Sequence, residues 1–101
     1  MERITRNDLN LAFAAHVAAL ERHGLHDPAT GRYVLDIGSK TYGRAYRLAF
    51  IPTGETGHYR PKVGGDFLGM TAREAHRELV SRTSIIGDVF YVLEQREGVD
   101  A

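Results

Sequence analysis

The first 24 residues show the spacing of an amphipathic helix. Apolar side chains recur three or four positions apart, at Leu9, Phe13, Val17 and Leu20, and so fall on one helical face. Thr5, followed three residues later by Asp8, is typical of a helix start, because both side chains can bind free backbone N–H groups of the first turn. Gly24 commonly terminates such a run. The pattern predicts a helix over residues 6–23.

After this helix the pattern changes to an alternation of period two, which is typical of strands. Residues 32–37, RYVLDI, place alternate apolar side chains on one side of a short strand. Gly38-Ser39 predicts a turn, and a longer strand is expected from about residue 41 to 51. A third segment, HYRPKV, contains Pro61, which indicates an edge strand or an extended loop because proline lacks an N–H for a neighbouring strand. These segments predict a three-stranded antiparallel meander.

The last third of the chain returns to helical spacing. Thr71 and Glu74 form a second helix-start signal. Steps of four, three, four and three then connect Leu79, Thr83, Ile86, Phe90 and Leu93. They predict one long helix over residues 72–95. In the alternative interpretation the helix ends near Thr83 and DVFYVLE is a fourth strand, because Val, Phe and Tyr favour strands.

Together these elements predict an α+β fold in a single domain, residues 1–101. It comprises an N-terminal helix, a three-stranded antiparallel meander and a long C-terminal helix packed on one sheet face. The middle strand has two unlike sides. One is small, with Thr41, Gly43, Ala45 and Ala49, and the other is larger, with Tyr42, Arg44, Tyr46, Leu48 and Phe50. The small side suits close helix packing, but the larger side is the alternative candidate for the core.

Composition narrows the classes of function. The chain has 43% hydrophobic and 26% charged residues, no cysteine and a formal net charge of zero, which is typical of soluble globular proteins. No stretch approaches about 18 apolar residues, and the N-terminus is charged, so we expect a cytoplasmic protein without a membrane association. The five histidines share no metal-ligand spacing, and no nucleophile motif is present. We therefore expect no cofactor, no metal and no enzymatic activity.

The middle of the chain carries a candidate binding face. Residues 32–62 hold six Lys or Arg against two acidic residues, and four of the five tyrosines. Basic and aromatic side chains on one strand face are typical of nucleic-acid binding, because rings stack on bases and cations contact phosphates. The candidate residues are Lys40, Tyr42, Arg44, Tyr46, Arg60 and Lys62. The alternatives are an ordinary half-buried strand and a protein-binding face.

The C-terminal helical repeat is a second candidate surface. Its candidate residues for self-association into a homodimer are Leu79, Ile86, Phe90 and Leu93. A small domain need not bury all of this repeat, so the repeat predicts a protein contact. The leading hypothesis is a small non-enzymatic interaction module that binds a protein. The alternative is a nucleic-acid-binding module that uses the basic and aromatic face around residues 40–46.

Two stretches, GSKTYGRAYRL and FLGMTAREAHREL, resemble sequences of small uncharacterised proteins from phages that infect actinobacteria. The resemblance spans about residues 31–82 and implies a cytoplasmic accessory protein that acts on a host or phage protein. The order of helix, three strands and helix is also similar to that of double-stranded-RNA-binding domains. That family has a basic cluster where its second helix begins, whereas this chain has Thr71-Ala72-Arg73-Glu74 there. The difference argues against RNA binding.

Overall fold

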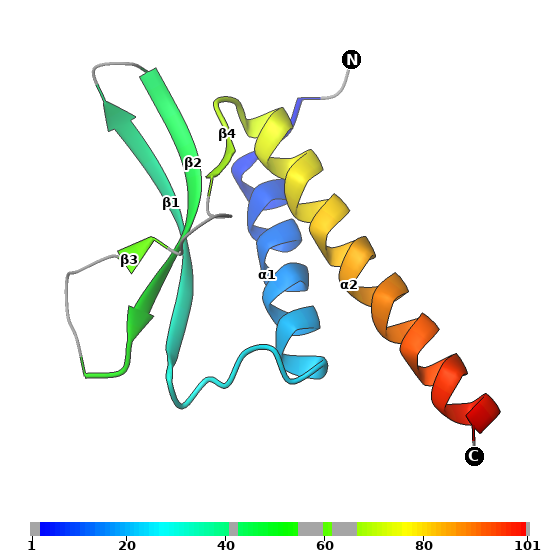
Figure 1. Ribbon diagram of the computed structural model, residues 1–101. Coiled ribbons are helices and arrows are strands. Elements are labelled where there is room, and N and C mark those ends of the chain that lie inside the picture. Colours follow the sequence, from blue (N-terminus) through cyan, green and yellow to red (C-terminus); the bar gives the residue numbers. More distant parts are fainter. Residues whose placement is uncertain (1–2, 41–42, 55–59, 62–66, 101) are drawn as a thin grey trace.

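The computed structural model describes residues 3–40, 43–54, 60–61 and 67–100. Its elements are α1 (Arg6–Arg22), β1 (Gly31–Lys40), β2 (Gly43–Pro52), β3 (Arg60–Pro61), β4 (Phe67–Gly69) and α2 (Ala72–Asp100). The two helices lie side by side on one side of the curved β1–β2 hairpin (Figure 1). The predicted α+β fold, with a helix at each end of an antiparallel sheet, is confirmed.

The sheet is built around β2. β1 pairs antiparallel with β2 along its whole length, and β3 and β4 pair antiparallel with different parts of β2. A strand has only two edges, so β3 and β4 share the edge that β1 leaves open. Pro61 lies in β3 at the end of the strand order, as its missing N–H predicts. β4 was not predicted, because three residues are too few to show an alternating pattern.

The predicted turn at Gly38-Ser39 is wrong. β1 continues through both residues, with Gly38 opposite Ala45 and Ser39 opposite Arg44. Glycine and serine favour turns locally, but pairing along β2 holds them in the extended conformation. The hairpin is therefore longer than the sequence pattern indicated.

α1 confirms the helix predicted over residues 6–23, and it begins as its sequence predicts. The backbone N–H of Asp8 donates to Thr5 Oγ1 at 3.1 Å, and the backbone N–H of Thr5 donates to Asp8 Oδ2 at 2.8 Å. Both bonds satisfy donors that a helix start otherwise leaves free. Ile4, just before the helix, packs against the same core as Leu9. These contacts fix where α1 begins relative to the sheet.

α2 is one continuous helix, so the alternative in which residues 88–94 form a fourth strand is wrong. At its start, the backbone N–H of Glu74 donates to Thr71 Oγ1 at 3.1 Å. Further along, Phe90 stacks on His23 at the end of α1, with ring centroids 4.3 Å apart. This contact and the helical spacing outweigh the local strand preference of the segment, because tertiary packing commonly overrides propensity.

The core lies between the helices and the larger side of β2. Its buried members are Leu9, Tyr46, Leu48, Leu68, Ala75 and Leu79, and Leu35 and Ile37 of β1 pack against them. The expectation that the small side of the middle strand faces the helices is therefore wrong. Tyr46 and Leu48 remove more apolar area from water than alanine and glycine would, which favours the arrangement observed.

Candidate functional site

Tyr46 is buried, so it does not belong to an exposed binding face. Its side chain is 5% exposed and belongs to the core, so the ring is not available to stack on a ligand. Lys40, Arg44 and Arg60 lie on strands, but their side chains lie outside the described part of the chain. Tyr42 and Lys62 lie outside the described residues altogether. Tyr46 is the only one of the six candidates whose side chain the structure describes, and it contributes to the hydrophobic core.

The predicted self-association stripe mostly serves the fold itself. Leu79 is fully buried in the core, Ile86 is half-buried, and Phe90 is half-buried against His23. Only Leu93, near the end of the stripe, is exposed. The regular spacing of these residues is therefore explained by the packing of α2 on α1 and the sheet.

A further set of apolar residues on α2, which shares only Leu93 with this stripe, is exposed. Ile85, Val89, Val92 and Leu93 are 57%, 50%, 54% and 44% exposed, and we call them the distal α2 surface. The first three lie four and three positions apart, so they fall on one side of the helix. Sequence reasoning missed this surface because two stripes of α2 share the same spacing, and only the fold shows which of them is covered.

The distal α2 surface is exposed for two reasons: Ile85 and Val89 lie on a side of α2 that α1 does not cover, and Val92 and Leu93 lie beyond the end of α1. α1 ends at Arg22, and its C-cap residue His23 stacks on Phe90. Beyond that contact α2 continues away from the rest of the fold (Figure 1). Residues 91–96 are all exposed. Several exposed apolar side chains in one segment are unusual for a monomer and commonly mark a contact surface.

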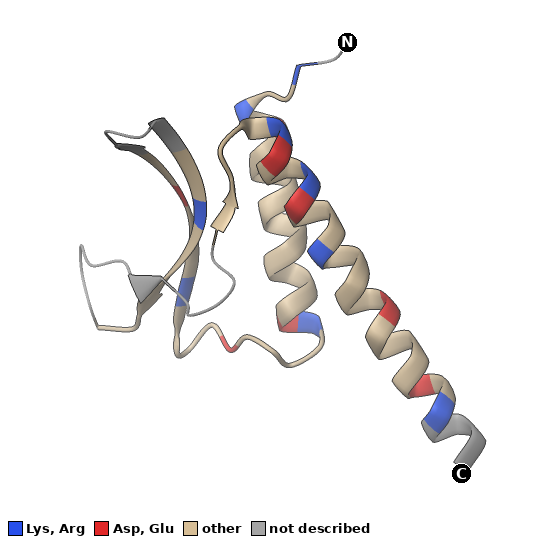
Figure 2. Ribbon diagram, turned by 45° about the horizontal axis from the view of Figure 1, so that its top comes forward, with Lys and Arg blue, Asp and Glu red and all other residues tan. Residues whose placement is uncertain are grey.

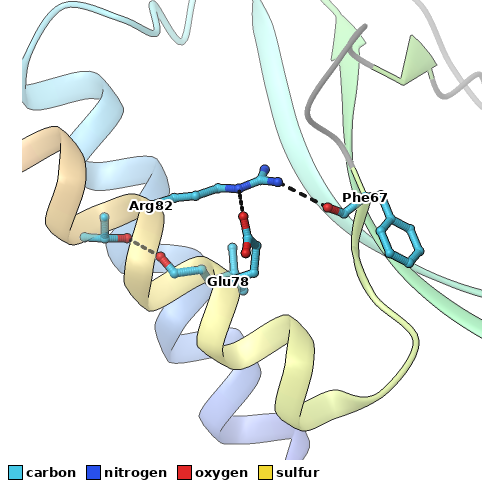
Figure 3. A network of polar contacts seen from close by, with 5 residues as sticks. Phe67, Glu78 and Arg82 are labelled. Atoms are coloured by element: carbon cyan, nitrogen blue, oxygen red, sulfur yellow. Dashed lines mark hydrogen bonds and ion pairs between the residues drawn. The ribbon is translucent and has the colours of Figure 1, made fainter.

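Charged residues flank the distal α2 surface. In Figure 2 the charges of α2 concentrate towards its two ends, and between Arg82 and Glu94 only Asp88 interrupts the uncharged stretch. Arg82 Nε donates to Glu78 Oε1 at 2.8 Å, and Arg82 Nη2 donates to the backbone oxygen of Phe67 in β4 at 3.1 Å (Figure 3). Arg82 therefore ties the proximal half of α2 to the sheet edge.

The histidines near the α1–β1 connection make structural contacts. The ring of His26 packs edge-on against the ring of Tyr33, with ring centroids 4.8 Å apart. Its centroid is 6.1 Å from the ring centroid of Phe50. His26 Nε2 is 4.0 Å from Glu21 Oε1. Within residues 3–40, 43–54, 60–61 and 67–100, no group of three His, Cys, Asp or Glu side chains is placed to hold a metal ion.

A hollow lies where the N-terminal ends of α1 and α2 meet. Its lining includes Arg3, Arg6 and Arg73, with Tyr46 from β2. Thr5 and Thr71 already accept hydrogen bonds from backbone N–H groups in the first turns of the two helices. The caps thus occupy donors that would otherwise serve an anion, and the hollow is a weaker candidate than the distal α2 surface.

His16 in α1 is a buried histidine whose Nδ1 is unsatisfied within the described part of the chain. It is 5% exposed, and its Nδ1 contacts no donor or acceptor among the described residues. Burial lowers the pKa of His16, because it disfavours the charged imidazolium, and the positive charge of Arg82 lowers this pKa further. The folded protein therefore holds His16 neutral.

We expect this histidine to reduce stability in mild acid. The unfolded chain binds a proton at His16 near its ordinary pKa of about 6.5, whereas the folded chain binds it only at lower pH. The free energy of unfolding should therefore fall as the pH drops below that value, by at most about 1.4 kcal/mol per pH unit from this residue. Urea unfolding between about pH 7 and about pH 5 should show a smaller decrease for His16→Leu. Parallel pH profiles for both proteins would contradict this assignment.

Searches against models of protein families, curated proteins and solved structures found no match to this chain. Within the described residues, no helix combines the length and the apolar character that crossing a membrane requires. The function is therefore inferred from the fold and its exposed surface.

Proposed function

We propose that this protein is a non-enzymatic protein-binding module that docks an apolar partner surface along the distal α2 surface. The observation that supports this role is the exposure of Ile85, Val89, Val92 and Leu93 on a helix that extends beyond its own fold. Protein partners commonly recognise a helix through apolar anchors spaced three and four residues apart. The surface has this spacing.

The surroundings of the distal α2 surface also favour a protein partner. An apolar centre with charged residues at its margins is the usual composition of a protein interface. Nucleic acid would instead require cations and accessible rings, but Tyr46 is buried and the chain has no net positive charge. A partner encoded by a phage or its host, in the cytoplasm, remains the prediction that the sequence resemblance implies.

The proposal predicts that one charge within the surface strongly weakens partner binding. Val89→Asp places a carboxylate in the middle of the surface, and Val89 is half-exposed, so the fold should tolerate it. We expect the full chain, immobilised and exposed to a bacterial lysate, to enrich specific proteins or further copies of itself. Val89→Asp should reduce this enrichment by about tenfold or more, because an unpaired charge would be buried on binding.

Ser84→Asp provides the matched control. Ser84 is exposed on α2 but lies on the side away from the distal surface, so the same charge there should leave binding unchanged. Equal capture by the wild type and both variants, or no capture by any of them and no self-association, would contradict the proposed function. Circular dichroism would establish that all three proteins are equally helical.

A further inference from the structure

The distal α2 surface is the centre of a longer stripe. Steps of four, three, four, three and four connect Glu78, Arg82, Ile85, Val89, Val92 and Arg96. Two helices can pack along such a stripe, because this repeat keeps one seam turned towards the partner. The stripe is apolar in the middle and charged at both ends. The orientation of a partner helix therefore decides which charges meet.

We propose that the occupant of this surface is a second copy of the chain, bound antiparallel through α2. Ile85 then faces Val89 of the second copy, and two-fold symmetry repeats the contact. Arg82 faces Val92 of the second copy, which its aliphatic stem can cover. This inference rests on the proposed function and names the partner for the same surface.

The charges at the two ends of the stripe support this alignment. It places Glu78 against Arg96 of the second copy, so opposite charges meet at both ends of the seam. The side chain of Glu78 is 45% exposed although it also contacts Arg82, and Arg96 is exposed, so both can be reached. Complementary charges at the margins of a helix seam fix its orientation and register.

Other alignments of the same stripe bring together unfavourable pairs. A parallel pair in register places Glu78 on Glu78, Arg82 on Arg82 and Arg96 on Arg96. An antiparallel shift by one heptad in one direction places Ile85 against Arg96 and leaves Glu78 without a cationic partner. The opposite shift places Glu78 against Val89 and Arg82 against Ile85, so neither end charge meets its opposite. Like charges that face each other across a seam oppose association. The antiparallel alignment described above is therefore the favoured one.

The seam contains few apolar layers, so the dimer should be weak and concentration-dependent, as small interfaces usually are. Light scattering on the full chain should show a mass that rises from 11.2 kDa towards twice that value as the concentration increases. Arg96→Glu should weaken the dimer by about tenfold, because it places like charges at both ends of the seam. Glu78→Lys combined with Arg96→Glu should return the affinity to within about threefold of the wild type.

Arg77→Glu is the matched control for charge, because it makes the same change of charge at an exposed position of α2 that lies off the stripe. It should leave the dimer affinity unchanged. Recovery in the double variant separates a seam contact from a general effect on folding, because a folding defect would persist when a second substitution is added. A double variant that dimerises no better than Arg96→Glu would overturn the proposed register.

Disulfide formation tests the orientation directly, because the chain has no cysteine of its own. In an equimolar mixture of Ile85→Cys and Val89→Cys, mild oxidation should join the two variants to each other. Each variant alone should form at least about fivefold less disulfide, because identical positions are offset in the antiparallel seam. Equal crosslinking of Val89→Cys to itself would indicate a parallel pair and overturn the proposal.

The two proposals fail in different ways. A mass that stays at the monomer value across the whole concentration series overturns the second-copy inference. If the wild type then still captures another protein, and Val89→Asp loses it while Ser84→Asp retains it, the proposed function stands with a different partner.

Discussion

Replacing Leu79 by alanine is expected to lower the free energy of unfolding by about 2–5 kcal/mol. Leu79 has no exposed surface and belongs to the cluster in which α1, β2, β4 and α2 meet. The substitution removes buried methyl groups and leaves a cavity that rigid neighbours on four elements cannot fill. A domain of this size is commonly stable by only about 5–15 kcal/mol, so a large part of the stability should be lost.

Urea or thermal unfolding measures this loss, and Val80→Ala is its matched control. Val80 is the next residue of α2 but is 47% exposed, so its truncation should change the free energy of unfolding by less than about 0.5 kcal/mol. Equal effects of the two substitutions would contradict the placement of Leu79 in the core.

Gly69→Ala is the second substitution expected to be strongly destabilising, by about 2–4 kcal/mol. Gly69 ends β4 with a φ of +154°, which side chains rarely permit. A Cβ there would lie 2.5 Å from Cβ of Glu74 and 3.1 Å from the backbone nitrogen of Ala75. Both atoms belong to the first turn of α2, which cannot move without breaking its contact with the sheet.

The control for Gly69 is the helical Gly87, where a Cβ would meet no atom within 4 Å. Gly87→Ala should raise the free energy of unfolding by about 0.5–1 kcal/mol, because alanine loses less backbone entropy in a helix. Opposite signs for the two substitutions, measured by chemical denaturation, would confirm the chain path at both sites. A stabilising Gly69→Ala would contradict the close approach of β4 and α2.

The starts of the two helices could be predicted from the sequence, because the residues that determine them lie within a few positions of each other. The start of α1 follows from Thr5 and Asp8, whose reciprocal hydrogen bonds form within four residues of chain. The start of α2 follows from Thr71 and Glu74, where the Glu74 backbone N–H donates to Thr71 Oγ1 and the Thr71 hydroxyl donates to Glu74 Oε1. Gly38-Ser39 shows the limit of such rules, because turn-forming residues become strand residues when a long partner strand is available.

The sequence does not show which face of a helix or strand is buried when the residues on both faces are spaced equally regularly. The larger side of β2 contains Tyr46, and its alternation with small residues fits an exposed face as well as a core face. On α2 the stripe through Leu79 and the stripe through Ile85 have the same spacing. The side of α2 that packs on α1 and the sheet decides which stripe is covered, and this depends on the packing of the whole fold.

The continuity of α2 bears on how tightly its exposed end can bind. An isolated helix as short as the distal segment would be marginal in water, because starting a helix is unfavourable. Here the buried half of α2 supplies the start, and the distal residues only extend it. The conformational entropy of ordering the surface is therefore lost when the domain folds and not when a partner arrives. A preorganised surface of this kind can support specific association even when few side chains take part.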